Sequence, residues 1–298
     1  MIRRVDFIVN PRAGRGRASL RAAEAARLLT DAGVACGIHV PKSGPAAAEI
    51  AERAARPGSC VVACGGDGTV HWTLQGVMRG ESAFDILATG TGNDIHAAIH
   101  GESGDAVALL VRRILGGTTR AIDVGHASTQ DSERFYLAVC TTGFDSVVNL
   151  RANGISRGPS QARYVAALLA ELPSLRPRTW NITQGQQTWQ DSGVILAVAN
   201  GGIYGGGMRI SPRASLSDGL LDVTLVGEVG RLRLVTLFPL VYTGTHVHRP
   251  EVRTWSTREI QIDGDAAPVM CDGEHLGELP VSVRSVPDSL HVCTAPVA

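Results

Sequence analysis

Three glycine-rich turns in the first third of the chain could bind a phosphate group. They lie at residues 10–16, 65–69 and 90–94, and each comes just before a segment with a helical pattern. Glycine lets backbone N–H groups approach phosphate oxygens closely, and a helix N-terminus adds positive potential at the same point. A single turn of this kind is equally well explained as an ordinary strand-to-helix connection. Three of them together favour a nucleotide-binding site.

Two of these turns also carry an aspartate. Asp67 lies between Gly66 and Gly68, and these small neighbours suit a close approach to a ligand. Asp94 follows Asn93 at a predicted helix start, where an N-cap role explains it well. Carboxylates beside a phosphate are typical ligands of magnesium. Asp67 is therefore the stronger candidate for chemistry.

The chain does not offer a phosphate-binding lysine. Lys42 is the only lysine among 28 basic residues, and it follows Pro41 outside any known phosphate motif. P-loop enzymes and protein kinases both place a lysine over the phosphates. If this chain binds ATP, the phosphate charge must be neutralised by metal, by backbone N–H groups and by arginines such as Arg12 and Arg15.

The segments around the glycine turns alternate between strand and helix patterns. Strands are predicted at residues 5–9, 34–40 and 60–64 and from residue 86, with helices at 19–32, 46–55 and 70–79. This rhythm predicts a parallel sheet with helices on both faces. Ligands of such sheets bind beyond the carboxyl ends of the strands, which is where the three turns fall.

The pattern changes after Asp123, where strands dominate. Gly, Asp and Pro turns separate strands predicted at residues 135–140, 180–183, 194–200, 221–226, 259–262 and 281–283. One helix, at residues 162–172, interrupts them. This pattern of strands and turns predicts a second, mostly antiparallel β domain. The apolar run at 232–242 could dock on a membrane or line a lipid pocket, although core packing is favoured. His246 and His248 suit a solvated loop or edge strand better than a metal site.

Composition describes a globular protein without a strong electrostatic preference. The chain has 298 residues, of which 44% are hydrophobic and 19% charged, and its net charge is zero. Nothing therefore draws it globally to nucleic acid, and a nucleic-acid partner is not expected. No apolar run approaches the length of a membrane span, and the N-terminus shows no signal core. A cytoplasmic location is expected.

The ordered set of motifs along the chain resembles the diacylglycerol kinase catalytic-domain family. That family includes bacterial lipid kinases and is related to the sphingosine and ceramide kinases. The Gly-Gly-Asp-Gly-Thr run at 65–69 alone is shared with NAD kinases and phosphofructokinase-like enzymes, but the complete set is more specific. It comprises Asn10-Pro11-x-x-Gly14, the turns at 65–69 and 90–94, Asp123-Val-Gly125, Gly143-Phe144-Asp145, the run at 204–208, Pro212-x-Ala214, Asp218-Gly219-x-Leu221-Asp222 and Asp272-Gly273-Glu274.

The resemblance implies a NAD kinase/diacylglycerol kinase-like architecture. An α/β nucleotide-binding domain with a parallel sheet would span residues 1–122, with 287–298 returning to it. An antiparallel β-sandwich at 123–286 would bind the lipid, and the active site would lie in the cleft. ATP would contact Asn10, Arg12, Gly14, Gly65, Gly66, Asp67, Gly68, Thr69, Thr91, Asn93 and Asp94.

The resemblance also assigns catalytic and metal roles. Asp272 matches the general base of the family, and Glu274 of the same motif and Asp67 are grouped with it as catalytic. Mg²⁺ would be bound through Asp218 with the backbone carbonyls of Ser215 and Leu220, and Asp94 and Asp123 match other positions of the acidic network. The expected partner is a lipid at the inner face of the membrane, where the protein would be peripheral. Family members are often dimers, so a homodimer is possible.

Three departures from the family pattern lie near the nucleotide turns. His71 stands where asparagine is common, Trp72 where glutamate is frequent, and Ala88-Thr89 replaces a usual proline. Two other interpretations stay open beside the ATP-dependent diacylglycerol kinase, and the departures at Trp72 and Ala88-Thr89 suggest the second of them. One is an NAD kinase-like enzyme, and the other is a regulatory protein that binds a nucleotide without transferring phosphate. A Rossmann oxidoreductase is weaker, because Ser19 occupies the third glycine position.

Overall fold

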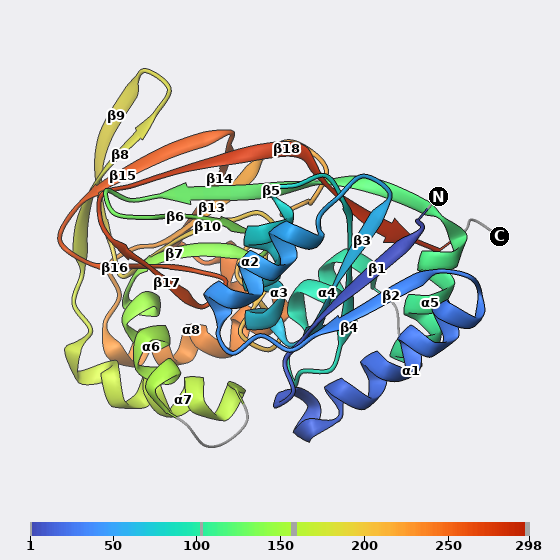
Figure 1. Cartoon of the computed structure of the whole chain (residues 1–298). Coiled ribbons are helices and arrows are strands. Elements are labelled where there is room, and N and C mark those ends of the chain that lie inside the picture. Colours follow the sequence, from blue (N-terminus) through green and yellow to red (C-terminus); the bar gives the residue numbers. More distant parts are fainter. Residues whose placement is uncertain (1, 102–103, 156–159, 296–298) are drawn as a thin grey trace. The chain divides into compact units, whose positions relative to one another are not determined.

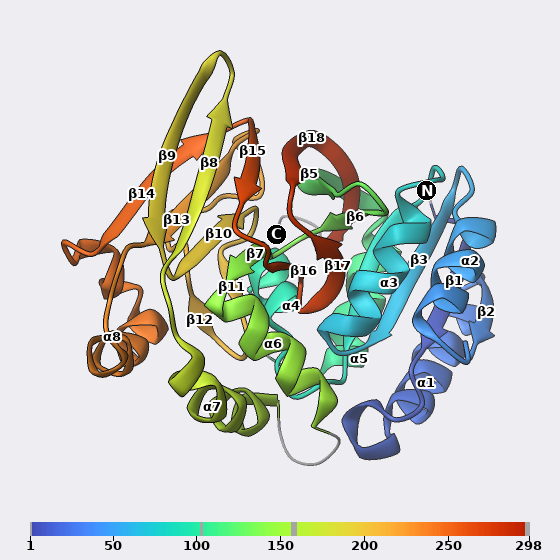
Figure 2. The same cartoon turned by 90° about the vertical axis from the view of Figure 1, so that its left-hand side faces the viewer.

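The computed structural model of the chain describes residues 2–101, 104–155 and 160–295. The chain divides into two compact units, one formed by Met1–Ile122 with Asp288–Ala298 and the other by Asp123–Pro287. The strands β5 (Thr118–Ser128) and β18 (Val281–Thr294) are the two places where the chain passes between the units. Residues 296–298 of the expected return segment lie outside the described residues. Figures 1 and 2 show the order of the elements along the chain.

The first unit is built on a parallel sheet. Its strands follow the order β2-β1-β3-β4-β18, and each neighbouring pair is parallel. They span β1 (Arg4–Val9), β2 (Ala35–His39), β3 (Ser59–Gly65) and β4 (Ala83–Ala88). The helices are η1 (Ala13–Gly16), α1 (Ala18–Asp31), α2 (Gly44–Ala54), α3 (Asp67–Val77), α4 (Asp94–His100) and α5 (Ala106–Gly116).

Side-chain alternation explains why both faces of this sheet are covered. Val5, Phe7 and Val9 of β1 join a buried core with residues of α1 and α5. Strand β3 is buried at every position, as expected for a central strand between two helical layers. On the other face of the sheet, α2 packs closely on α3. The approach is so close that a Cβ added at Gly76 would lie only 2.1 Å from the Ala48 carbonyl oxygen. The predicted parallel sheet with helices on both faces is confirmed.

Capping residues and a glycine set the ends of these helices. Gly33, at φ +85°, follows α1, and the Val34 N–H returns to the Leu29 carbonyl as in a Schellman motif. Ser43 caps α2 by accepting a hydrogen bond from the Ala46 N–H. Asp105 caps α5 in the same way through the Val107 N–H, at 2.8 Å.

The second unit is a β-sandwich. One antiparallel sheet has the order β14-β13-β10-β7-β16-β17, and the other contains β18-β15-β8-β9. A shared core of inward side chains, including Trp180, Leu196, Val223 and Ile260, joins the two sheets. The strands are β6 (Glu133–Tyr136), β7 (Val139–Gly143), β8 (Arg178–Gln184), β9 (Gln187–Gly193), β10 (Ile195–Ala199), β11 (Ile203–Tyr204), β12 (Met208–Arg209), β13 (Leu221–Val226), β14 (Val252–Thr257), β15 (Glu259–Gly264), β16 (Pro268–Cys271) and β17 (Glu274–Glu278).

Two predictions for this unit are wrong in detail. The single strand expected at 135–140 is two strands, β6 and β7, because the N–H groups of Leu137 and Ala138 bond a carboxylate instead of a neighbouring strand. The one expected helix is joined by others, since the unit contains α6 (Phe144–Gly154), α7 (Ser160–Glu171), η2 (Leu172–Ser174), α8 (Arg231–Thr243) and η3 (Thr245–His248). Among the described residues, no helix has the length and apolar character needed to cross a bilayer.

Candidate active site

The three glycine turns of the first unit meet at the carboxyl ends of β1, β3 and β4. The Asn10 side chain donates to the Thr69 hydroxyl across 3.4 Å, which joins the first turn to the second. A Cβ at Gly14 would lie 2.7 Å from the Thr89 carbonyl oxygen, so the first turn also touches the third. We call residues 10–17, 65–69 and 89–94 the glycine-turn cluster.

Glycine is required where the second and third turns meet. A Cβ at Gly90 would lie 2.5 Å from the Gly66 Cα atom and 2.8 Å from Asn93 Oδ1. Both distances are shorter than van der Waals contact, and the nearest atom belongs to the backbone, which cannot rotate away. The two turns therefore lie backbone to backbone, as a surface that receives phosphate groups through N–H donors requires.

Asp67 and Asp94 lie together in this cluster. Asp67 is the first residue of α3, and its Oδ1 accepts a hydrogen bond from the Ile95 N–H at 3.2 Å. Asp94 is the first residue of α4, and Asn93, at φ +60°, occupies the N-cap position. The predicted N-cap role of Asp94 is therefore wrong by one residue, because Asn93 occupies the N-cap position, and the amide of Ile95, the second residue of α4, is bonded by Asp67 of a neighbouring turn.

The cluster contains buried oxygen atoms that lack a hydrogen bond. Within the described parts of the chain, Thr89 Oγ1 and Asn93 Oδ1 are buried without a partner. An unmade hydrogen bond of this kind costs about 1–3 kcal/mol, so such groups are kept where a ligand or ordered water completes them. The Asn93 amide donates to the Gly90 carbonyl at 3.0 Å, which fixes the side chain in this orientation.

Other predicted ATP contacts lie at the surface of the cluster. Asn10, Arg12 and Thr91 are exposed, and the Arg12 N–H bonds Asn10 Oδ1 at 3.1 Å. Arg15 is exposed and has φ +58°. Exposed arginines beside the turn remain available to compensate phosphate charge.

Trp72 has a packing role away from the glycine turns. Its indole ring lies over Gly44 at the start of α2, where an added Cβ would meet the ring at 2.4 Å. His71 is fully buried beside it, with the two ring centroids 5.6 Å apart. Trp72 therefore packs α3 against α2 and His71 packs beside it, whereas Thr89 belongs to the glycine-turn cluster itself.

Asp272 of the second unit is held by backbone N–H groups. Its carboxylate accepts hydrogen bonds from Leu137 at 2.9 Å, Ala138 at 2.9 Å and Val139 at 3.1 Å. Its own N–H returns to the Val139 carbonyl at 2.9 Å, and its backbone is left-handed at φ +50°. These bonds fix the direction of the carboxylate before any substrate binds. Glu274 begins β17, two residues further on.

A buried asparagine connects the backbone segment that holds this carboxylate to the backbone of Asp123. The Asn200 amide donates to the carbonyls of Asp123 at 3.0 Å and Leu137 at 3.2 Å. Asp123 is itself buried, and its Oδ2 accepts the Gly219 N–H at 2.7 Å. Asn200 is a site residue that the motifs do not predict; its one signal in the sequence is a polar residue at the end of an apolar strand, directly before Gly201.

Comparison with known proteins identifies the family. The family described as the diacylglycerol kinase catalytic domain matches residues 4–127, and the YegS C-terminal NAD kinase β-sandwich-like domain matches residues 138–294. A diacylglycerol kinase of Mycobacterium tuberculosis strain H37Rv is 33% identical over 294 residues, which cover 98% of this chain and 95% of that protein. The chain belongs to the diacylglycerol kinase and YegS-like lipid kinase family.

More distant relatives of this lipid kinase share its whole length. The diacylglycerol kinase of Bacillus subtilis strain 168 is 22% identical over 296 residues, covering 98% of this chain and 96% of that one. A crystal structure of a diacylglycerol kinase from Bacillus anthracis superposes with a TM-score of 0.71 at 19% identity, covering 99% and 97% of the two chains. This likeness confirms the predicted fold, an α/β domain followed by an antiparallel β-sandwich.

The loop at 215–222 of this lipid kinase contains the residues predicted to bind magnesium. Asp218 is exposed, and its Oδ1 accepts the Leu220 N–H at 3.0 Å. Burial raises the pKa of Asp222, and the negative charge of Asp218 raises it further, although Ser256 and Arg213 oppose this. Carboxylates that repel each other beside backbone carbonyls suit a cation that keeps several waters. The described residues contain no cluster of three or more His, Cys, Asp or Glu side chains.

The two histidines noted at 246 and 248 lie in different environments. His246 is buried in η3 and bonds the Ile210 carbonyl at 3.1 Å, whereas His248 is exposed. His100 of α4 lies 3.0 Å from the buried carboxylate of Asp85, which also binds Arg113 at 2.9 Å. A solvated loop or edge strand at 246–248 was therefore the wrong expectation for His246.

Proposed function

We propose that this lipid kinase transfers the γ-phosphoryl group of ATP to a hydroxyl of diacylglycerol and forms phosphatidic acid. The glycine-turn cluster is the observation that carries the proposal. Its turns approach backbone to backbone, and its buried Thr89 and Asn93 oxygens lack partners within the described residues. The names of the relatives that match along the whole chain support a diacylglycerol acceptor.

Different residues of the chain would have different roles in phosphoryl transfer. Backbone N–H groups of the three turns receive the phosphates, with Arg12 and Arg15 available for their negative charge. Asp67 holds the start of α4, directly after the third turn, through the Ile95 N–H. This transfer depends on alignment and charge compensation more than on covalent chemistry, which explains how a chain without a phosphate lysine could perform it.

Asp272 would act as the general base. The acceptor oxygen attacks the γ-phosphorus, its O–H bond breaks with the proton passing to Asp272, and the bond from the γ-phosphorus to the bridging oxygen breaks to release ADP. Three N–H donors already orient the carboxylate, so little reorganisation is needed.

Mg²⁺ would be held by Asp218 with the carbonyls of Ser215 and Leu220. When bound it supplies positive charge that the phosphates and the acidic loop require. Asp123 stabilises this loop through the Gly219 N–H. Asp67 and Asp94 lie in the first unit, where a Cβ added at Gly92 would meet a carboxylate oxygen of each, at 3.0 and 3.8 Å. We place the reaction at the inner face of the membrane, where the acceptor lipid resides.

The test is phosphoryl transfer from labelled ATP with magnesium. Separate vesicles would contain diacylglycerol, ceramide, sphingosine or phosphatidylglycerol, with NAD as a soluble acceptor. Asp272→Ala and Asp67→Ala would be compared with Gly154→Ala, a matched control at which an added Cβ meets no atom within 4 Å.

We expect label in diacylglycerol with wild type and Gly154→Ala, and none with either aspartate variant. Label in another lipid would change the acceptor but keep the lipid kinase. Label in NAD alone would contradict the proposal in favour of an NAD kinase. ATP binding without any transfer would favour the regulatory reading.

A further inference from the structure

Helix α8 exposes an apolar stripe that its packing does not use. Leu234 and Leu237 are buried and anchor the helix, as core packing predicts. Leu232, Val235 and Tyr242 are 86%, 40% and 36% exposed, and Pro239 is exposed between them. Spacings of three, four and three residues place these four side chains on one side of the helix. We call them the α8 stripe.

The helix that carries the stripe is firmly held. The Phe238 ring lies 6.0 Å from the ring of Tyr164 on α7 and 5.8 Å from that of Tyr242. The Tyr164 hydroxyl donates to the buried carboxylate of Asp145 at 2.6 Å, and the Tyr204 hydroxyl donates to the same oxygen at 2.7 Å. The stripe is therefore displayed on a rigid element. Helix α7 also exposes apolar side chains, with Val165 at 38% and Leu169 at 59%.

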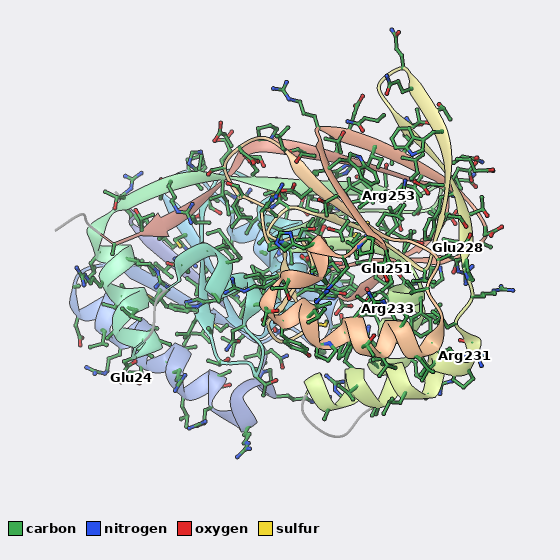
Figure 3. The ribbon with its side chains drawn as sticks, turned by 180° about the vertical axis from the view of Figure 1, so that it is seen from behind. Glu24, Glu228, Arg231, Arg233, Glu251 and Arg253 are labelled. Atoms are coloured by element: carbon green, nitrogen blue, oxygen red, sulfur yellow. The ribbon has the colours of Figure 1, made fainter. Side chains whose placement is uncertain are left out.

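Positive charge accompanies the stripe at both ends of the helix. Arg231 and Arg233 lie in the first turn, and Arg249 is exposed shortly after the last turn, while α8 itself contains no acidic residue. Figure 3 shows Arg231 and Arg233 at the same end of α8, with Glu228 and Glu251 near them. Arg233 binds Glu251 at 2.6 Å, and Arg231 donates to the Pro173 carbonyl at 2.6 Å. Both arginines are thus held at the surface where the stripe begins.

We propose that the α8 stripe docks this protein on an anionic lipid bilayer. An apolar stripe bordered by arginines, with a tyrosine at one end, is the pattern of a helix that lies in the plane of a membrane surface. Leucine and valine enter the boundary between headgroups and acyl chains, and Arg231 and Arg249 contact anionic headgroups, since the charge of Arg233 is balanced by Glu251. The inference rests on the proposed function, because a kinase of bilayer lipids must reach its acceptor at the surface.

Vesicle sedimentation without nucleotide or acceptor tests the stripe separately from catalysis. The vesicles would be an equimolar mixture of phosphatidylcholine and phosphatidylglycerol. Leu232→Asp should weaken binding by at least about tenfold, because burying one leucine is worth about that much in partition. The matched control is Leu20→Asp on α1, where the leucine is 72% exposed and the binding should stay within about twofold of wild type, as for a side chain outside the interface.

A second variant tests the same surface by an expected gain of membrane affinity and of a fluorescence signal. Leu232→Trp should bind at least as tightly as wild type, and the added indole fluorescence should shift to shorter wavelength and be quenched by brominated acyl chains. Short-chain diacylglycerol dissolved in water should be phosphorylated equally by wild type and Leu232→Asp. If wild type transferred no phosphate but Leu232→Asp still weakened vesicle binding, only the proposed reaction would be contradicted, and the docking proposal would stand.

Two outcomes would overturn the docking proposal. In one, Leu232→Asp binds vesicles as wild type does, or Leu20→Asp loses as much binding. In the other, Leu232→Asp changes the oligomeric state in solution, measured by light scattering, which would make the stripe a contact between two copies of the chain.

Discussion

The glycine-turn cluster of the first unit and the Asp272 region of the second use their polar groups in opposite ways. In the cluster, backbones lie so close that a side chain is excluded at Gly90, and two buried oxygens have no partner within the described residues. Around Asp272, three N–H groups already bind the carboxylate. In the first region two oxygens are left open to a ligand, whereas in the second the protein itself completes the carboxylate. A kinase needs both, because it must accept a nucleotide and orient a base in advance.

The strongest test of this comparison asks whether Asp272 is a general base or only holds the backbone of residues 137–139 in place. Asp272→Asn should lower kcat by about 10²–10⁴-fold, since an amide cannot accept the proton of the acceptor hydroxyl. Its amide N–H₂ would also face one of the three donors, which should cost about 1–3 kcal/mol in the free energy of unfolding. Steady-state kinetics and urea unfolding would measure the two effects.

Asn200→Ala is the matched control for Asp272. It removes hydrogen bonds to the same backbone segment, at Leu137, without removing a base. If both variants lost activity in proportion to stability, the carboxylate would have a structural role alone.

A second test concerns the buried ion pair beneath the third glycine turn. Asp85 of β4 is completely buried with Arg113, so Asp85→Asn would leave a buried guanidinium without its partner and should cost about 3–5 kcal/mol. The exposed pair of Arg27 and Asp31 provides the control, where Asp31→Asn should change the unfolding free energy by about 0.5 kcal/mol or less.

The Asp85 contribution should also depend on pH. Burial alone would raise the pKa of Asp85, but His100 and Arg113 together hold it below its usual value of 3.8. The folded state therefore binds this proton less readily than the unfolded state does. The stabilisation is present above the unfolded pKa and is lost as pH falls below it. The difference in thermal midpoint between wild type and Asp85→Asn should shrink below pH ~4; a difference that grew on acidification would contradict this.

A third prediction sharpens the claim that the cluster is shaped for a nucleotide. Gly90→Ala should weaken ATP binding by about 1–3 kcal/mol, because its Cβ would push the second and third turns apart. Titration calorimetry would measure the affinity. Gly154→Ala should bind ATP as wild type does, and an equal affinity for Gly90→Ala would show that the close approach has no functional purpose.

The smallest expected effect lies in the second unit, at His246. Burial lowers the pKa of His246 below its usual 6.5, although a hydrogen bond with the Ile210 carbonyl partly offsets this. The unfolded state then binds more protons below that value, so stability should fall as pH drops from 7 to 5. His246→Gln should lose less stability than wild type over this range. The exposed His248→Gln variant is the control and should keep the wild-type dependence.

Local patterns predicted the regular elements well. The helix expected at 19–32 is α1, and the strand expected at 221–226 is β13, because apolar periodicity and glycine stops act over short distances. The buried face of α8 was harder to predict, since leucines and valines occur on every side of this helix. Only tertiary packing distinguishes the buried Leu234 from the exposed Leu232. The interruption between β6 and β7 could not be foreseen, because its cause is Asp272, far along the chain.

The sequence by itself determined the turns, the parallel sheet and the family, since glycines, aspartates and their order along the chain carry that information. Tertiary structure decided which groups complete one another. It brought the Ile95 amide of α4 to Asp67, placed Trp72 over Gly44, and joined the carbonyls of Leu137 and Asp123 through the amide of Asn200. These partners are separated by many residues, and a hydrogen bond or a van der Waals contact depends on distance in space, which local pattern does not specify.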